Sequence, residues 1–146
     1  MATRILATLA DTAAFAKEVA LSCKGGEVLG LIGDLGAGKT AFTQLLAQSL
    51  GVVREVKSPT FTLMQCYPTG EAAQAQGIAR LCHVDAYRIA DEKELRGIGI
   101  EEYAGDPQTV TVVEWADLAP FLKRYPGYRE LRFSLEGQGR KIEWNA

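Results

Sequence analysis

Apolar positions recur along the chain with two different periods, which predict strands and helices in turn. A short strand is expected over residues 4–9. Asp11 then offers an N-cap for a helix whose apolar positions are three or four residues apart, namely Phe15, Val19 and Cys23. The continuous apolar run at 27–32 is typical of a strand that is buried on both faces.

A second apolar stripe follows residue 40 and predicts another helix, which we expect Gly51 to end at the C′ position. Further strands are expected at 61–67, 78–83, 109–113, 130–135 and 141–144, and short helices at 91–96 and 118–125. The first two of these strands are joined by a polar stretch that contains Pro68, Gly70 and Gly77 and is expected to be a hairpin loop. The alternation predicts an α/β fold, a mostly parallel but mixed sheet flanked by helices, with a C-terminal antiparallel strand pair.

The loop after the strand at 27–32 carries the sequence Gly-Asp-Leu-Gly-Ala-Gly-Lys-Thr at positions 33–40. Glycines in such a loop let several backbone N–H groups and a helix N-terminus converge on one phosphate. Lys39 can neutralise the β- and γ-phosphates, and the Thr40 hydroxyl suits magnesium, which prefers oxygen ligands. We interpret the segment as a P-loop rather than as a chance match in a glycine-rich turn.

The P-loop predicts ATP and Mg²⁺ as cofactors and a P-loop NTPase-like fold, with residues 1–146 forming a single P-loop ATPase domain. The residues expected to contact the nucleotide here are Asp34, Leu35, Gly36, Ala37, Gly38, Lys39, Thr40 and Ala41.

Glu114 directly follows the β-branched strand at 109–113. A P-loop needs a second acid for its magnesium ion, and a parallel strand would deliver this carboxylate to the edge of the sheet where the P-loop lies. The alternative is a surface acid at a strand end. Trp115, the next residue, either stacks on the nucleotide or belongs to the core.

Two further segments contain candidate hydrolytic residues. In the run at 83–88, period-two spacing places His83, Asp85 and Tyr87 on one face of a strand end, where Asp85 can orient the attacking water. His83 alone is more typical of a structural residue. In Ser-Pro-Thr-Phe-Thr at 58–62, Thr60 is the candidate γ-phosphate sensor, and a simple turn is the alternative.

Charge and cysteine content restrict the possible partners and compartment. The 16 basic and 18 acidic residues give a net charge of −2, so no general positive field is available to hold RNA. The basic residues Lys123, Arg124, Arg129 and Arg132 are interpreted as a solvated face, with an RNA or partner contact as the alternative. Three cysteines, none within three residues of another, argue against a disulfide framework or a zinc knuckle and favour a reducing cytoplasm. No leader pattern is seen and no apolar run approaches the ~20 residues of a membrane span, so no membrane contact is expected.

Taken together, these motifs resemble the TsaE (YjeE) family in their order and spacing: residues 33–40, 58–62, His-Val-Asp-Ala-Tyr-Arg at 83–88 and Val-Glu-Trp at 113–115. The resemblance implies a bacterial ATPase needed to form threonylcarbamoyladenosine (t6A) beside the anticodon of tRNAs. It also implies a TsaB–TsaD-like heterodimer as the partner, with tRNA contacted only through the complex.

The resemblance also implies roles for individual residues. Lys39 and Thr40 would hold phosphate and magnesium, Glu114 would be the second magnesium contact, and Asp85 and Thr60 would serve hydrolysis. Trp115 would be a functional aromatic residue, and Thr12 would lie near the nucleotide. One departure is Ala41, because family members often have a second threonine there that can bind the α-phosphate.

Two rival functions stay open on the sequence. A small P-loop kinase would transfer the γ-phosphate to a metabolite, but it needs a lid, and only the basic residues at 123–132 offer one. A regulatory module would bind ATP without hydrolysing it.

Overall fold

The computed structural model describes residues 2–57, 63–87, 89 and 91–145, in which seven strands form one mixed sheet. The strand order is β1-β7-β6-β2-β5-β4-β3. The strands are β1 (Ala2–Leu6), β2 (Val28–Ile32), β3 (Met64–Pro68), β4 (Arg80–Asp85), β5 (Thr109–Glu114), β6 (Tyr128–Glu136) and β7 (Gly139–Trp144).

Parallel pairing occupies the centre of the sheet and antiparallel pairing its two sides. Strand β2 pairs in parallel with β5 and β6, and β4 pairs in parallel with β5. The antiparallel pairs are β1 with β7, β6 with β7, and β3 with β4. The predicted α/β fold with a mixed sheet and a C-terminal antiparallel strand pair is therefore confirmed.

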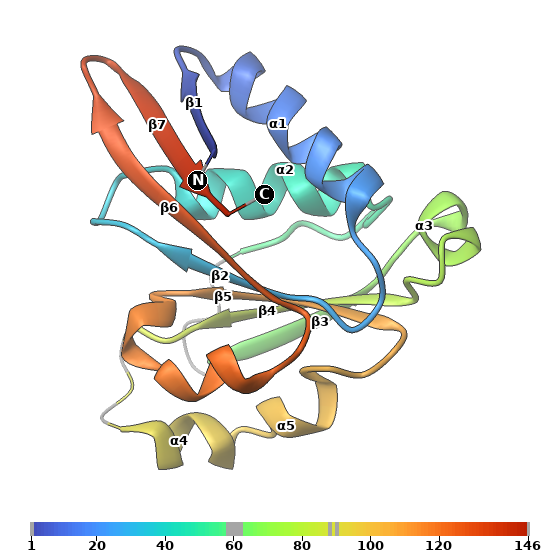
Figure 1. Ribbon diagram of the computed structural model, residues 1–146. Coiled ribbons are helices and arrows are strands. Elements are labelled where there is room, and N and C mark those ends of the chain that lie inside the picture. Colours follow the sequence, from blue (N-terminus) through green and yellow to red (C-terminus); the bar gives the residue numbers. More distant parts are fainter. Residues whose placement is uncertain (1, 58–62, 88, 90, 146) are drawn as a thin grey trace.

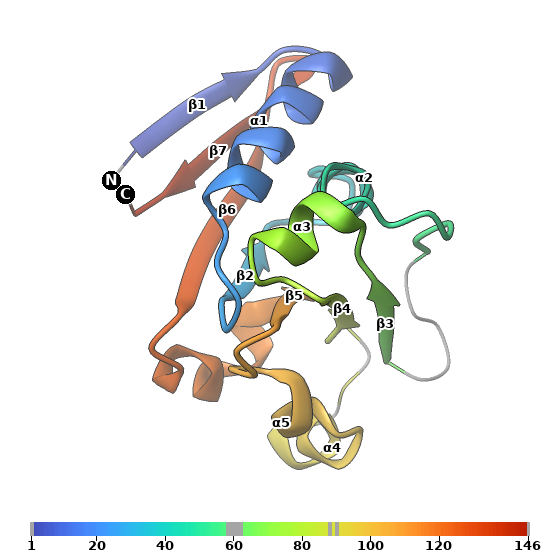
Figure 2. The same ribbon diagram turned by 90° about the vertical axis from the view of Figure 1, so that its right-hand side faces the viewer.

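Helices cover both faces of the sheet (Figures 1 and 2). One face carries α1 (Leu9–Ser22), α2 (Lys39–Ser49) and α3 (Glu71–Ala75), and the other carries α4 (Glu92–Gly97), α5 (Ile100–Tyr103) and the 3₁₀ helices η1 (Ala116–Leu118) and η2 (Pro120–Arg124). Each face has its own hydrophobic core, centred on Phe42 and Leu46 on one side and on Leu95 and Leu122 on the other. None of the described helices has the length and apolar content needed to cross a bilayer.

Helix α1 begins earlier than the sequence predicts. Thr8, not Asp11, is the N-cap: its hydroxyl accepts from the Asp11 N–H, and the Asp11 carboxylate accepts from the Thr8 N–H. This reciprocal capping box satisfies two N–H groups that the helix leaves free, which is why Asp11 lies inside the first turn. Helix α2 ends as predicted, because Gly51 follows its C-cap residue, Leu50, with φ 77°.

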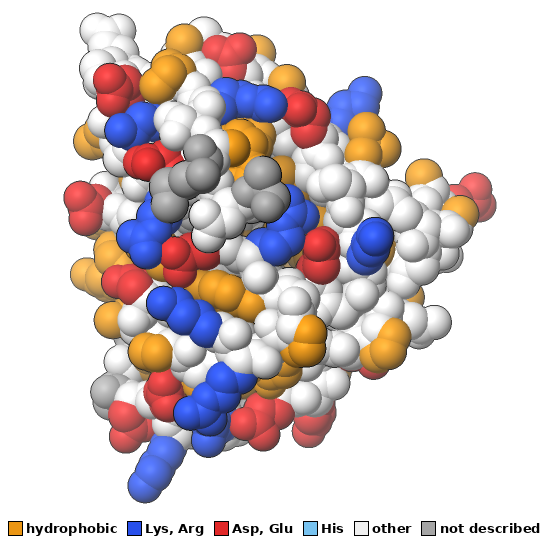
Figure 3. Space-filling model, viewed as in Figure 1, with side chains coloured by type: hydrophobic (Ala, Val, Ile, Leu, Met, Phe, Trp, Pro, Cys, Tyr) orange, Lys and Arg blue, Asp and Glu red, His pale blue; other side chains and the backbone are white. Residues whose placement is uncertain are grey.

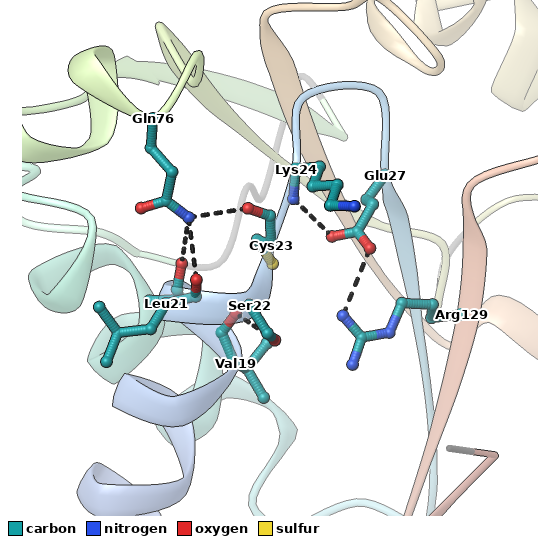
Figure 4. Close-up of polar contacts among 9 residues, drawn as sticks. Val19, Leu21, Ser22, Cys23, Lys24, Glu27, Gln76 and Arg129 are labelled. Atoms are coloured by element: carbon teal, nitrogen blue, oxygen red, sulfur yellow. Dashed lines mark hydrogen bonds and ion pairs between the residues drawn. The ribbon is translucent and has the colours of Figure 1, made fainter.

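The C-terminal end of α1 is held by a side chain from the loop after α3 (Figure 4). The Gln76 amide nitrogen donates to the carbonyls of Ala20, Leu21 and Cys23 at 3.1, 3.1 and 2.8 Å. Helix ends leave such carbonyls without partners, so this amide replaces the missing hydrogen bonds. The predicted hairpin loop between β3 and β4 is thus partly helical, and it locks α1 in place.

The expectation that the three cysteines form no disulfide framework is wrong for two of them. Cys66 of β3 and Cys82 of β4 are directly opposite each other in the antiparallel ladder and form a disulfide, whereas Cys23 is free and buried. Their separation of 16 residues reveals nothing about strand register, and the register is what brings the sulfur atoms together.

Candidate nucleotide site

Three parallel strands end beside the P-loop. Strand β5 lies between β2 and β4, with Glu114 opposite Leu31 on one side and Asp85 on the other. The P-loop joins the end of β2 to α2. Because ligands bind in open α/β sheets at the carboxyl ends of the strands, this edge is the expected site.

The backbone of the P-loop takes conformations that favour glycine. Gly36 and Gly38 have φ values of 82° and 105°. Gly33 passes close to β6, since a Cβ atom there would lie 2.4 Å from the Phe133 carbonyl oxygen. Gly38 is the N-cap of α2 and provides no side-chain cap, so the first N–H groups of this helix are available to an anion.

Lys39 is buried beneath the P-loop, and its ammonium is held by the loop itself. It donates to the carbonyls of Gly33 and Asp34, the latter at 3.1 Å, and lies 3.9 Å from the centroid of the Trp115 indole. Burial lowers the pKa of Lys39, while the negative charge of Glu114 acts in the opposite direction. These contacts hold the Lys39 ammonium beneath the P-loop. A bound phosphate could replace the two carbonyls as its hydrogen-bond acceptor.

Glu114 connects the P-loop helix to β4. Its Oε1 atom accepts from the Thr40 hydroxyl at 2.9 Å, and its Oε2 atom is 2.5 Å from Nε2 of His83. The Glu114 side chain is only 3% exposed. A hydroxyl and a carboxylate that already touch form an oxygen donor set of the kind that magnesium binds, so the residues present fit this ion. The alternative reading of Glu114 as a surface acid is wrong.

Asp85, Tyr87 and Trp115 line a cavity of about 360 Å³, together with Lys39, Thr40 and Glu114. The Asp85 carboxylate accepts from the Tyr87 N–H at 3.0 Å. The rings of Tyr87 and Trp115 are 4.9 Å apart, and Trp115 has φ 60°, a left-handed conformation that ends β5 abruptly. Trp115 is thus part of the cavity wall as well as being packed against the second core.

A second, mostly apolar cavity of about 200 Å³ lies on the other side of Gly38. Thr12 and Ala41 line it, together with Leu6 and Phe133. The structure therefore brings Thr12, predicted to lie near the nucleotide, next to the P-loop. An apolar cavity beside a phosphate cradle has the character expected of a nucleoside site.

Sequence reasoning missed Arg140. This residue of β7 lines both cavities, and its side chain lies 3.6 to 3.8 Å from the position of a Cβ atom on Gly38. Within the described part of the chain, its hydrogen bonds go only to the backbone carbonyls of Gln138 and Gly139. The guanidinium is thus not neutralised by a carboxylate among these residues. The hairpin glycines indicated only a turn, and no sequence signal showed that the turn reaches the P-loop.

The basic residues at 123–132 do not form a continuous positive surface. Arg129 pairs with Glu27 and Arg132 pairs with Glu130. Figure 3 shows Lys and Arg side chains interspersed with Asp and Glu over the face that it presents. The pairing favours the interpretation of these residues as a solvated face.

The candidate residues thus gather at one edge of the sheet, apart from Thr60, which lies outside the described residues. Their individual roles stay predictions, because geometry alone does not test them. Six of the predicted nucleotide contacts from the P-loop line one cavity with Asp85, Glu114 and Trp115, namely Leu35, Gly36, Gly38, Lys39, Thr40 and Ala41. Asp34 and the buried Ala37 are not in its lining, and Thr12 lines the neighbouring cavity.

Known proteins share both the sequence and the fold. The family model described as threonylcarbamoyl adenosine biosynthesis protein TsaE matches residues 6–142. A Bacillus subtilis protein named tRNA threonylcarbamoyladenosine biosynthesis protein TsaE is 46% identical over 108 residues, which cover 74% of this chain and 62% of that relative. A Treponema pallidum protein of the same name is 36% identical over 87% of this chain and 88% of its own length.

The crystal structure of Bacillus subtilis YdiB superposes with a TM-score of 0.75 at 32% identity, covering 99% of this chain and 84% of that one. The family match runs from the last residue of β1 into β7 and so contains β2 to β6 in full. The chain belongs to the TsaE family.

Proposed function

We propose that this chain binds and hydrolyses ATP with magnesium, and that its ATPase cycle supports the formation of t6A on tRNA. The observation that carries the proposal is the 2.9 Å hydrogen bond between the Thr40 hydroxyl and the Glu114 carboxylate, next to the buried Lys39 ammonium. The names of the relatives support the link to t6A, since those proteins are called tRNA threonylcarbamoyladenosine biosynthesis proteins.

Each part of the site has a separate task in this proposal. The P-loop N–H groups and Lys39 hold the β- and γ-phosphates, and Thr40 and Glu114 hold the metal. Magnesium, when bound, neutralises charge on the phosphate oxygens. Asp85 accepts a proton from, or orients, the water that attacks the γ-phosphate, and Thr60 senses that phosphate.

The nucleoside part of ATP would occupy the apolar cavity that Thr12 lines, and Arg140 would contact a phosphate where the two cavities meet. A guanidinium presents several N–H donors in a plane, which suits phosphate oxygens. Because Ala41 lacks the second hydroxyl common in the family, Arg140 supplies a side-chain contact on that side of the P-loop.

A TsaB–TsaD-like heterodimer is the proposed partner, and tRNA would be contacted only through that complex in the cytoplasm. Two apolar side chains at the mouth of the P-loop cavity support a partner there, since Leu35 is 79% exposed and Tyr87 is 54% exposed. A cavity this open admits water freely, so we propose slow hydrolysis by the chain alone and faster hydrolysis in the complex.

Reconstitution tests this function. Purified TsaB and TsaD are added to the chain, and phosphate release from ATP and t6A formation on tRNA are measured with and without Mg²⁺. We expect both to require all components and magnesium. If TsaB and TsaD neither bind the chain nor change its rate of phosphate release, the functional assignment is wrong, and stoichiometric phosphorylation of a small acceptor would identify a kinase instead.

A further inference from the structure

We propose that His83 is a positioning residue that fixes the Glu114 carboxylate in the orientation needed to bind magnesium. The inference rests on the proposed function, because it concerns the same metal site. The structure assigns His83 no contact with the nucleotide cavity: the residues that line it include Asp85 and Glu114 but not His83. Its effect on the metal would therefore pass through Glu114 alone.

Strand register places the imidazole where it can hold this carboxylate. His83 of β4 is opposite Val112 of β5, and the next pair on the same face is Asp85 with Glu114. The two side chains are therefore diagonal neighbours, and Nε2 of His83 lies 2.5 Å from Oε2 of Glu114. Because His83 is fully buried and belongs to an inner strand, the ring itself has little freedom to move.

The hydrogen bonds of His83 distinguish this role from that of an ordinary buried histidine. Its Nδ1 atom has no partner among the described residues. Within these residues, the ring therefore makes its hydrogen bond with Glu114, through Nε2. A carboxylate accepts hydrogen bonds, so Nε2 is the ring nitrogen that donates to Glu114. Burying a polar ring with a single hydrogen bond costs stability. A functional role for that hydrogen bond accounts for a histidine at this position.

The carboxylate needs such a restraint because two partners compete for it. One oxygen accepts from Thr40, whose hydroxyl is the other proposed metal ligand. The Lys39 ammonium also interacts electrostatically with Glu114. A carboxylate freed from His83 can turn away from the metal position toward that cation, which would weaken metal binding.

Two substitutions and a matched control test the inference. His83→Leu removes the donor, whereas His83→Gln keeps an amide N–H at a similar reach. Thr111→Val is the control: its buried hydroxyl on neighbouring β5 also has no partner among the described residues, and its side chain is on the opposite face from Glu114. Binding of a fluorescent ATP analogue is titrated with MgCl₂ and, separately, measured in EDTA, and thermal unfolding reports folding.

For His83→Leu, the magnesium concentration at half-saturation should rise about tenfold or more, the usual effect of removing a partner of a metal ligand. His83→Gln should recover most of this loss, Thr111→Val should match the wild type, and binding in EDTA should be equal in all four proteins. A folded His83→Leu protein with wild-type magnesium dependence would overturn the inference. If the wild type itself shows no magnesium-dependent binding, the proposed function fails as well.

A second measurement needs no substitution, so it applies even if His83→Leu does not fold. The chain contains one histidine, so its imidazole ¹⁵N resonances identify themselves. We expect a protonated Nε2 atom, whose resonance changes when Mg²⁺ is added to the nucleotide complex. An unprotonated Nε2, or resonances that do not respond to Mg²⁺, would contradict the proposal.

Discussion

Replacing Arg140 with alanine tests the least expected part of the nucleotide site. The guanidinium lines both cavities beside Gly38, and within the described residues it donates to two carbonyls of its own turn. Arg140→Ala therefore breaks no described ion pair, and the fold should tolerate it. The loss should appear in nucleotide affinity.

The size of the loss follows from one charge-assisted hydrogen bond to a phosphate. Such a bond contributes about 1.5–3 kcal/mol, and each 1.4 kcal/mol corresponds to about a factor of ten in the dissociation constant. We therefore expect Arg140→Ala to bind ATP about 10- to 150-fold more weakly. Arg140→Lys keeps the charge but loses the planar fork, so its affinity should be intermediate.

Isothermal titration calorimetry with ATP and with adenosine separates a phosphate contact from general damage. The matched control is Arg132→Ala, which removes an arginine of the same hairpin that is paired with Glu130 at 2.8 Å. The Arg140 variant should lose affinity for ATP much more than for adenosine, and the Arg132 variant should lose neither. ATP affinity within twofold of wild type for Arg140→Ala would refute the reasoning.

Three further predictions concern the site and the stability of the fold. Glu114→Ala should raise the magnesium concentration needed for ATP binding, whereas Asp85→Ala should spare binding and slow hydrolysis by about 100-fold or more; equal loss of binding in both would show that these roles are wrongly divided. Gln76→Ala should lower the free energy of unfolding in urea by about 1–3 kcal/mol, because it leaves three carbonyls of α1 without their donor. Gln44→Ala, which removes one bond to a carbonyl, should cost less, and an equal cost would argue against capping by Gln76. Burial raises the pKa of Cys23 to about 12; since the folded state holds this proton more tightly, the resulting stability is present at neutral pH and should be lost as pH rises from the ordinary thiol range toward 12. Urea unfolding at pH 8 and pH 11 measures this loss, which should shrink in Cys23→Ala.

The parts of the site that the sequence predicted are those in which adjacent residues carry the signal. The P-loop is a contiguous segment with its lysine and threonine in place, and Glu114 follows an unbroken β-branched strand. The P-loop follows β2 and Glu114 ends β5, and these two strands are parallel neighbours. Their carboxyl ends therefore meet at one edge of the sheet. Local pattern and topology were enough here.

The features that escaped prediction depend on how distant segments align. The Cys66–Cys82 disulfide needs the register of β3 against β4, and the pairing of Nε2 of His83 with Glu114 needs that of β4 against β5. Arg140 reaches the P-loop because β7 joins the sheet beside β6. Composition and spacing carry no register, so a correct list of strands still leaves these contacts undetermined.

The place of β1 in the sheet affects how the protein is made. Its sheet partner is β7, with Ala2 opposite Trp144, so the two ends of the described chain lie side by side (Figures 1 and 2). On the ribosome, residues 2–6 emerge long before residues 139–144 and must wait for a partner. The apolar cavity near Thr12 is also walled by both segments. A nascent chain that lacks β7 therefore cannot complete the wall of this cavity, and the candidate nucleotide site is finished only when the last strand has been made.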